Sequence, residues 1–283
     1  MSVEFVRALI PSAASGLPEL HLFEGPYVVV DGRRTELPEG SKRLLVYVAL
    51  HGGSVERRVA AGALWPVGND VRAAGNLRSA LWRLRGAGIE LLEADHCTLR
   101  LRGDTVVDLH VVSDWAARLI EGCADVDDLN TGAWRSHALE LLPGWYDDWV
   151  VFERERLRQR VLHGLESLGR LLIREDRCAE AVEAVMSVIG ADPLRESAQR
   201  VLIEAHLAEG NVREARRAYD IYRAMALREL RVEPGVQLTA LLEGDRPSPL
   251  GAVTGLHRPP NPRFTGRPPG MPARVHAAGR ASH

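Results

Sequence analysis

The feature that most constrains the fold of this chain is an internal repeat in its second half. The segments LHGLESLGRLLIREDRCAEAVEAVMSVIGADPL and ESAQRVLIEAHLAEGNVREARRAYDIYRAMALREL resemble each other at a period of 34 residues. Glu180 corresponds to Glu214, and Asp176 corresponds to Gly210. A small residue at Gly169 permits the close helix contacts that stacked repeats need. The period therefore predicts two helical hairpins of the tetratricopeptide type.

Helical periodicity also continues on both sides of the repeat. Further helices are expected at about 111–122, 133–142, 150–160 and 235–243. From residue 244 onward the sequence is rich in proline and arginine and has no hydrophobic period, which predicts a disordered tail. A basic arm that binds phosphates is the alternative for this tail.

The first hundred residues alternate between strand-like and helix-like segments. The β-formers of 20–37, interrupted by Asp31 and Gly32, predict a small antiparallel sheet with a hairpin at that Asp-Gly pair. Helices are expected over 41–51 with Ser41 as its cap, over 56–64, and over 70–85 with Asn69 or Asp70 as its cap. A second hairpin is expected over 89–102. This order is that of a winged helix-turn-helix, with a generic α+β domain as the alternative.

The helix expected at 70–85 has two different faces. Leu77, Leu81 and Leu84 form one apolar stripe that faces the core. The candidate DNA-binding residues on its other sides are Arg72, Asn76, Arg78, Ser79, Arg83 and Arg85. Arginine offers a bidentate fork to guanine, and asparagine offers one to adenine, so this face fits a major groove. Trp82 shares the outer face and is interpreted as packing on the N-terminal sheet or on the second domain.

The arginines by themselves are weak evidence for a nucleic-acid site. Lys42 is the only lysine among the 36 Lys and Arg residues, so arginine is used throughout the chain, and the net charge is −2. A solvated helix face is therefore the alternative interpretation. In the second hairpin, alternation places Leu99 and Leu101 inward and Arg100 outward, which makes Arg100 the candidate contact of the wing.

Several classes of protein are excluded by what the sequence lacks. No apolar run reaches the ~18 residues of a membrane span. The three cysteines and ten histidines show no metal-ligand spacing, and no nucleophile elbow or glycine-rich phosphate loop is present. We therefore expect no metal, no cofactor and no enzymatic activity, and a cytoplasmic protein. The predicted organisation is a flexible N-terminus (1–17), a winged-helix DNA-binding domain (18–103), an all-α tetratricopeptide-like domain (104–243) and the tail (244–283).

Four blocks of this sequence resemble the Streptomyces antibiotic regulatory protein family over about 18–243. They are LPEGSKRLLVYVALHGGSVERRVAAGALWP, GNLRSALWRLR, LLPGWYDDWVVFERERLRQRVLHGLESL and DPLRESAQRVLIEAHLAEGNVREARRAYDIYRAMALRELRVEPGVQLTALL. The resemblance implies an OmpR-type winged helix followed by a bacterial transcriptional activator domain. It also implies a nucleoid-associated activator of antibiotic gene clusters that binds direct repeats in double-stranded DNA beside a second protomer and recruits RNA polymerase holoenzyme.

The chain departs from the family pattern at the start of the second helix. Glu56 stands where the family usually has serine, which puts the contact of this helix with the DNA backbone in doubt. Arg57 and Arg58 are the candidates that replace that contact. The family's Arg-Leu-Arg of the third helix maps onto Arg83 to Arg85. A tetratricopeptide-type interaction adaptor, with an N-terminal domain that does not bind DNA, is the alternative function.

Overall fold

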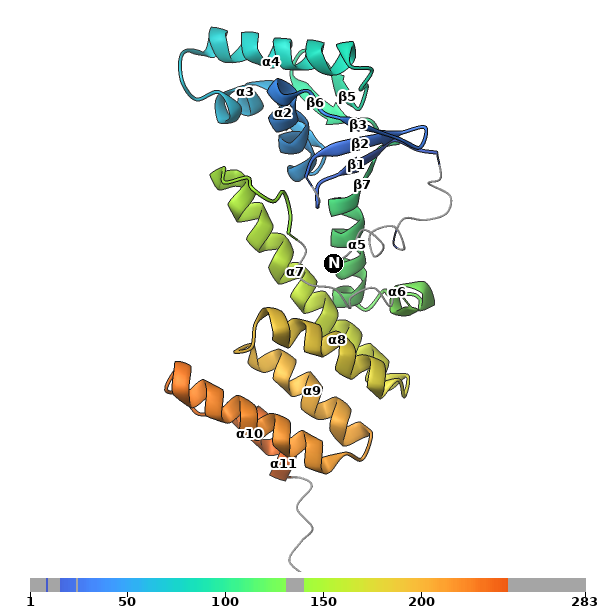
Figure 1. Ribbon diagram of the computed structural model, residues 1–283, viewed down its shortest axis with the longest axis vertical. Coiled ribbons are helices and arrows are strands. Elements are labelled where there is room, and N and C mark those ends of the chain that lie inside the picture. Colours follow the sequence, from blue (N-terminus) through green and yellow to red (C-terminus); the bar gives the residue numbers. More distant parts are fainter. Residues whose placement is uncertain (1–8, 10–15, 24, 131–139, 244–283) are drawn as a thin grey trace, which may run out of the picture. The chain divides into compact units, whose positions relative to one another are not determined.

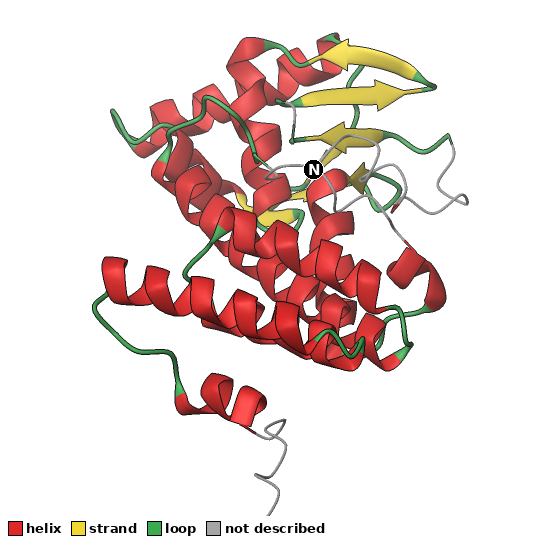
Figure 2. Cartoon of the chain, turned by 60° about the horizontal axis from the view of Figure 1, so that its bottom comes forward, coloured by secondary structure: helices red, strands yellow, loops and turns green. Residues whose placement is uncertain are grey.

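The chain folds as an α+β segment followed by a run of helices, as the computed structural model in Figure 1 shows for residues 9, 16–23, 25–130 and 140–243. The strands are Glu19–His21 (β1), Tyr27–Val30 (β2), Arg33–Glu36 (β3), Ser54–Glu56 (β4), Leu92–Ala94 (β5), Thr98–Leu101 (β6) and Val106–Val107 (β7). The helices are Glu39–Leu50 (α2), Arg57–Leu64 (α3), Asp70–Gly86 (α4), Asp108–Glu121 (α5), Val126–Asn130 (α6), Asp148–Arg174 (α7), Cys178–Ala191 (α8), Glu196–Ala208 (α9), Val212–Glu229 (α10) and Val236–Glu243 (α11). Figure 2 shows where the strands lie among the helices.

The N-terminal sheet has the strand order β3-β2-β1-β7. β1 pairs antiparallel with β2 and parallel with β7, so the sheet ends beside the start of α5. Asp31 and Gly32 join β2 to β3, with φ angles of 50° and 72°. Positive φ at both loop residues is what the two-residue hairpin turn requires, and aspartate and glycine tolerate it. The predicted Asp-Gly hairpin is confirmed.

Three helices and a three-stranded sheet of order β4-β6-β5 form the winged helix-turn-helix. In Figure 1, α4 lies at one end of the unit, and α2 and α3 lie next to it. Leu77, Leu81 and Leu84 are 1%, 9% and 2% exposed, so the predicted leucine stripe faces the core. Asn69 caps α4, because its side chain accepts a hydrogen bond of 3.0 Å from the backbone N–H of Arg72.

The predicted cap of the first of these helices is wrong. α2 begins at Glu39 with Pro38 as its N-cap residue, and Ser41 lies inside the helix. The Ser41 hydroxyl is buried and donates a hydrogen bond of 2.8 Å to the carbonyl oxygen of Ala80 in α4. A serine before an apolar run is a local signal for a helix N-cap. Here the side chain of this serine instead forms a hydrogen bond between α2 and α4.

The repeat predicted from the 34-residue period is present as two helical hairpins, α7–α8 and α9–α10. Asp176 and Gly210 occupy equivalent loop positions, with φ angles of 61° and 75°. In the first loop the backbone N–H of Arg177 donates to Leu172 (2.9 Å). In the second, the equivalent Asn211 donates to His206 (2.8 Å). The two turns therefore share one geometry, and the repeat is confirmed.

Close packing joins the successive helices of the repeat. A Cβ atom on Gly169 of α7 would lie 2.7 Å from a methyl carbon of Val185 in α8 and 3.0 Å from one of Val201 in α9. A side chain does not fit there without movement of its neighbours, which explains the glycine. One helix, α7, replaces the separate helix expected at 150–160 and continues into the first repeat.

Other predicted segments are only partly covered by the structure. The helix expected at 133–142 lies mostly outside the described residues, and Leu141 and Leu142 at its end are not helical. The flexible N-terminus and the disordered tail also fall outside the described residues, apart from Leu9 and residues 16–17. The helices expected at 111–122 and 235–243 are α5 and α11.

The LLPGWYDDWV block connects the helical segment to the winged helix. The backbone N–H of Leu142 donates to the carbonyl oxygen of Leu22, at 3.0 Å, just after β1. Arg154 of α7 donates to the carbonyl oxygens of Leu141 and Leu142, both at 2.9 Å. The ring of Trp149 meets that of Tyr47 in α2 edge to face, with centroids 5.2 Å apart. This block is thus a structural junction within residues 1–245, which form one unit.

Candidate nucleic-acid interface

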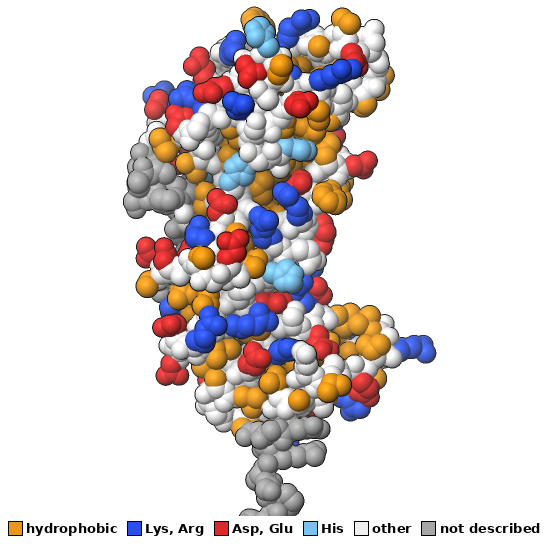
Figure 3. Space-filling view, turned by 180° about the vertical axis from the view of Figure 1, so that it is seen from behind, with side chains coloured by type: hydrophobic (Ala, Val, Ile, Leu, Met, Phe, Trp, Pro, Cys, Tyr) orange, Lys and Arg blue, Asp and Glu red, His pale blue; other side chains and the backbone are white. Residues whose placement is uncertain are grey.

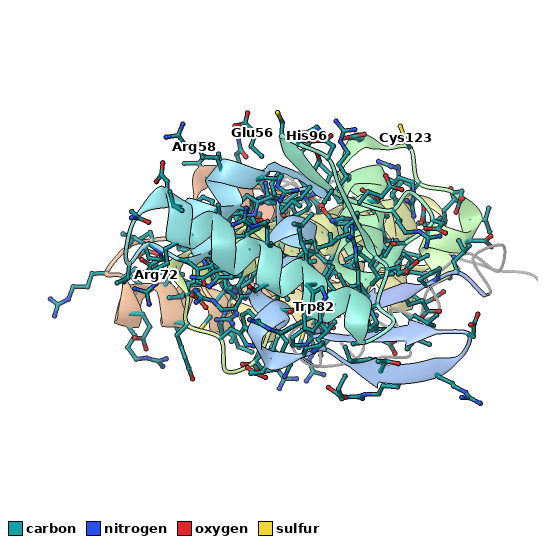
Figure 4. The ribbon with its side chains drawn as sticks, turned by 90° about the horizontal axis from the view of Figure 1, so that it is seen from above. Glu56, Arg58, Arg72, Trp82, His96 and Cys123 are labelled. Atoms are coloured by element: carbon teal, nitrogen blue, oxygen red, sulfur yellow. The ribbon has the colours of Figure 1, made fainter. Side chains whose placement is uncertain are left out.

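The outer face of α4 is exposed and carries most of the residues predicted to bind DNA. Arg72, Arg78, Ser79, Arg83 and Arg85 are exposed, and Asn76 is half-buried. The leucine stripe on the opposite side of α4 anchors the helix, so these side chains project from a rigid element. Figure 4 looks onto α4 from above and shows how its side chains lie relative to those of α3 and the β5–β6 turn.

None of the four arginines of α4 forms an ion pair with a carboxylate among the described residues. Arg78 and Arg85 form no ion pair with any residue that the structure describes. Both are basic side chains near the C-terminal half of a helix whose first turn carries Asp70. An exposed guanidinium group without a carboxylate keeps all of its donors available for a phosphate or a base edge.

Arg83 differs from these two arginines. Its Nη1 donates a hydrogen bond of 3.2 Å to the carbonyl oxygen of Gly40, in the first turn of α2. The contact spans 43 positions of the chain and lays the guanidinium group over α2, so close that a Cβ on Gly40 would clash with it. Arg83 therefore sits at the border between α4 and α2, with one of its five N–H donors used by the Gly40 carbonyl.

The interpretation of Trp82 as a packing residue is wrong. Its side chain is 75% exposed, and none of the aromatic contacts in the described part of the chain involves it. The N-terminal sheet and the helical segment bury other aromatic rings instead, among them Trp115 and Tyr27. The prediction failed because it assumed that a large aromatic side chain needs cover, whereas α4 faces solvent along this side.

The start of α3 is tied to the wing. Glu56 is exposed and makes no side-chain capping hydrogen bond with α3. Arg57 instead donates from Nη1 to the carbonyl oxygen of Asp95 in the β5–β6 turn, at 2.8 Å. Arg58 forms an exposed ion pair of 3.0 Å with Asp70. Of the two proposed phosphate contacts, Arg58 is the more accessible.

A groove of about 600 Å³ lies between α3, the first half of α4 and the wing turn. Ala61, Ala73 and Leu77 line its floor, and His96 and Arg58 belong to its lining as well. Figure 4 shows Glu56, Arg58 and His96 together along one edge of the molecule. This edge brings α3 and the wing next to each other.

The wing turn is held by one carboxylate. Asp95 accepts hydrogen bonds from the backbone N–H groups of Cys97 (2.7 Å) and Thr98 (2.6 Å) and from the Thr98 hydroxyl (2.6 Å). These bonds, with a smaller contribution from the charge of Arg100, lower the pKa of Asp95 to about 2. Leu99 is fully buried and Arg100 is exposed, so the predicted alternation is confirmed at these two positions.

The helix and the wing were predictable from the sequence, but the hydrogen bonds that join one element to another were not. The Arg83–Gly40 bond and the Arg57–Asp95 bond join residues 43 and 38 positions apart. No periodicity or motif signals such a pair. The exposure of Trp82 had a signal, namely its place opposite the leucine stripe on the helical wheel.

Comparisons with known proteins cover different parts of the chain. Residues 121–244 match the family model described as the bacterial transcriptional activator domain. The chain is 28% identical to the regulatory protein AfsR of Streptomyces griseus over 229 residues, which are 72% of this chain and 23% of AfsR. The chain thus spans about a quarter of the length of that curated relative.

The fold has a solved counterpart. The structure of Mycobacterium tuberculosis EmbR in complex with a low-affinity phosphopeptide matches with a TM-score of 0.61 and 19% identity. The match covers 80% of this chain and 64% of the EmbR chain. The predicted fold class, a winged helix followed by a tetratricopeptide-like helical segment, is confirmed, while the domain boundaries at 18, 104 and 243 stay predictions.

Proposed function

We propose, from the premise that this chain belongs to the Streptomyces antibiotic regulatory protein family of bacterial transcriptional activators, that it binds specific double-stranded DNA and activates a secondary-metabolite gene cluster. The observation that carries the proposal is the exposed outer face of α4, where Arg78 and Arg85 have no carboxylate partner. Within helix-turn-helix proteins the second helix of the motif enters the major groove. In this proposal the chain is a cytoplasmic, nucleoid-associated regulator and not an enzyme.

The contacts divide into two classes in this proposal. Arg72, Asn76, Arg78, Ser79 and Arg83 meet base edges or the phosphates that flank them, from α4. Contacts with the phosphate backbone come from Arg85, Arg57, Arg58 and, in the wing, Arg100. The accessible guanidinium groups of Arg58 and Arg100 support this assignment, because both lie outside the protein core.

The assembly on DNA follows from the family. Two protomers bind direct repeats upstream of a promoter, and RNA polymerase holoenzyme is the partner that the complex recruits. The helical segment supplies the protein contacts, because stacked helical hairpins present extended surfaces. The buried junction between α2 and α7, with Tyr47 against Trp149, supports a fixed arrangement of this segment on the winged helix.

A mobility-shift assay with the DNA upstream of the chain's own gene tests the proposal. The full chain is expected to shift this fragment at moderate salt. Arg83→Ala is expected to weaken specific binding by about 1–3 kcal/mol if Arg83 reads a base. Equal losses on specific and random DNA would assign Arg83 to the phosphate backbone instead.

Arg213→Ala supplies the matched control, because Arg213 is an exposed arginine of α10, far from α4 in the sequence. This variant is expected to bind DNA like the wild type. If neither the upstream DNA nor a library of genomic fragments shifts, the activator function fails. The adaptor function then replaces it, since the two helical hairpins remain as a protein-binding surface.

A further inference from the structure

Trp82 is exposed and makes no aromatic contact with any residue in the described part of the chain. Its side chain is 75% exposed on α4, while Trp115 is fully buried and Trp149 packs on Tyr47. A single exposed apolar residue is ordinary on a protein surface. Trp82, however, stands on the helix that the proposed function places in the major groove, and it is the largest side chain of that face.

The neighbours of Trp82 along α4 leave room for a ligand to reach it. Long side chains of a helix lean toward its N-terminus, so the Trp82 indole ring lies over the turn that carries Arg78 and Ser79. Gly75, two turns before Trp82, has no side chain, and Ser79 has a short one. The ring therefore stands above a shallow stretch of helix, with Arg78 before it and Arg85 after it.

The positive charges of Arg78 and Arg85 and the apolar ring of Trp82 together indicate what kind of ligand fits this face of α4. Arg78 and Arg85 make no ion pair within the residues that the structure describes, so the surroundings of the indole ring favour a polyanion. A protein partner that covers the ring with apolar side chains would bury these guanidinium groups, and no carboxylate among the described residues pairs with them. Double-stranded DNA satisfies both the ring and the charges.

The major groove presents one prominent apolar group, the C5-methyl of thymine. We propose that Trp82 is a specificity-determining residue that contacts a thymine methyl group in the major groove. The inference rests on the proposed function and deepens it, because it names a base that the site reads. Arg78 and Arg85 then hold the flanking phosphates or bases and fix the position of α4 over the thymine.

The test starts from a duplex selected by the wild-type full chain from a randomised double-stranded DNA library. Trp82→Ala is expected to weaken binding to this duplex by about tenfold and to change binding to random DNA by less than about twofold. Replacing the contacted thymine by deoxyuridine removes only the methyl group. This replacement is expected to weaken wild-type binding by about threefold and to leave Trp82→Ala binding unchanged.

Two further variants sharpen the test. Trp82→Phe keeps an apolar ring but lacks the indole N–H donor, and it is expected to retain the preference for thymine over deoxyuridine. Phe152→Ala removes another large exposed aromatic side chain, 70% exposed in α7, and is expected to bind DNA like the wild type. Thermal unfolding of each variant verifies that it is folded.

The outcomes separate this inference from the proposed function. If the wild type selects a duplex, and Trp82→Ala binds it as tightly with no deoxyuridine effect in either protein, the thymine contact is refuted while DNA binding stands. If Trp82→Ala changes only self-association in sedimentation, the face belongs to a contact between copies of this chain and the inference is overturned. If no duplex is selected at all, the proposed function itself fails.

Discussion

Arginines on α4 and many arginines on the helical repeats have different surroundings in this molecule. In the repeats several arginines are paired with carboxylates, for example Arg177 with Glu180 at 2.7 Å and Arg223 with Glu233 at 2.6 Å, whereas Arg213 and Arg216 of α10 form no ion pair with a described residue. Figure 3 shows basic and acidic side chains interspersed over the face that it displays. On α4, Arg78 and Arg85 have no such partner among the described residues. Arginine thus forms stabilising ion pairs at several positions of the repeats, whereas Arg78 and Arg85 carry positive charge that no described carboxylate neutralises.

The presence or absence of an ion pair distinguishes arginines that the composition alone cannot distinguish. A chain with a single lysine uses arginine everywhere, so an arginine in the sequence says little about its task. Whether a carboxylate lies within reach is more informative, because the N–H donors of a paired guanidinium group already bond to that carboxylate and are not available to a ligand. α4 carries four arginines on one helix, and none of them forms an ion pair with a described residue, which indicates this helix more strongly than the sequence does.

Among the arginines that form ion pairs, Arg195 is expected to contribute most to stability. Arg195 pairs with Glu166, which is 3% exposed and also accepts a hydrogen bond from Ser197 at 2.8 Å. Arg195→Ala is expected to lower the free energy of unfolding by about 3–5 kcal/mol, because it leaves a buried carboxylate without its main partner. Urea denaturation measures the loss.

The control for this variant is a double change. Arg195→Met with Glu166→Gln removes both charges and is expected to recover most of the lost stability. If Arg195→Ala costs less than about 1 kcal/mol, the pair is not the structural element that the comparison assumes. The DNA affinity of the folded variant is expected to stay at the wild-type value.

The next prediction concerns Asp108, a buried carboxylate that has no arginine partner among the described residues, and the pH dependence of stability. Asp108 is buried at the start of α5 and accepts hydrogen bonds from the backbone N–H groups of Leu22 (2.7 Å), Phe23 (3.2 Å) and Leu109 (2.7 Å). Burial raises the pKa of Asp108 to about 6, although these bonds and the nearby His21 act in the opposite direction. The folded state therefore binds an additional proton between about pH 4 and pH 6.

Stability consequently falls as the pH rises through this window. Relative to Asp108→Asn, which cannot titrate, the wild type is expected to lose about 1–3 kcal/mol of unfolding free energy between pH 4 and pH 7. Urea denaturation of both proteins at the two pH values measures the difference. A wild type that gains stability over Asp108→Asn with rising pH would show that the backbone donors outweigh burial.

The role of the unpaired arginines of α4 is tested by removing Arg78 and Arg85 together. The free energy of unfolding of the double variant Arg78→Ala/Arg85→Ala is expected to lie within about 0.5 kcal/mol of the wild-type value, because neither side chain forms an ion pair with a residue that the structure describes. Its DNA binding is expected to lose about 1 kcal/mol or more, and its salt dependence to become shallower by about one charge for each phosphate contact removed. Fluorescence anisotropy at several salt concentrations measures both, and an unchanged salt slope would contradict phosphate contacts.

The smallest effect is expected where an arginine is paired but exposed. Arg58 and Asp70 pair at 3.0 Å with side chains 88% and 82% exposed, so Asp70→Asn is expected to change stability by less than about 1 kcal/mol. The change frees Arg58 and removes a negative charge beside the proposed DNA face. Binding to random DNA at low salt is expected to strengthen by about two- to threefold. A weaker affinity would indicate that Asp70 positions Arg58 for its phosphate.

The amino-acid sequence by itself determined the local elements of this protein. The leucine stripe of α4, its Asn69 cap, the Asp31–Gly32 hairpin and the 34-residue repeat depend on residues close together in the chain, where helical and strand periodicity act directly. The candidate site could be predicted to this extent, since its helix and wing are local features.

Only the tertiary structure decided how each side chain of these elements is used. It assigned Ser41 to a contact with α4, bound Arg83 to the first turn of α2, left Trp82 in solvent and separated paired from free arginines. These outcomes depend on which elements meet, and the Ser41 and Arg83 contacts join residues 39 and 43 positions apart. A hydrogen bond or an ion pair forms wherever a partner lies within reach, and that distance is fixed by packing rather than by sequence spacing.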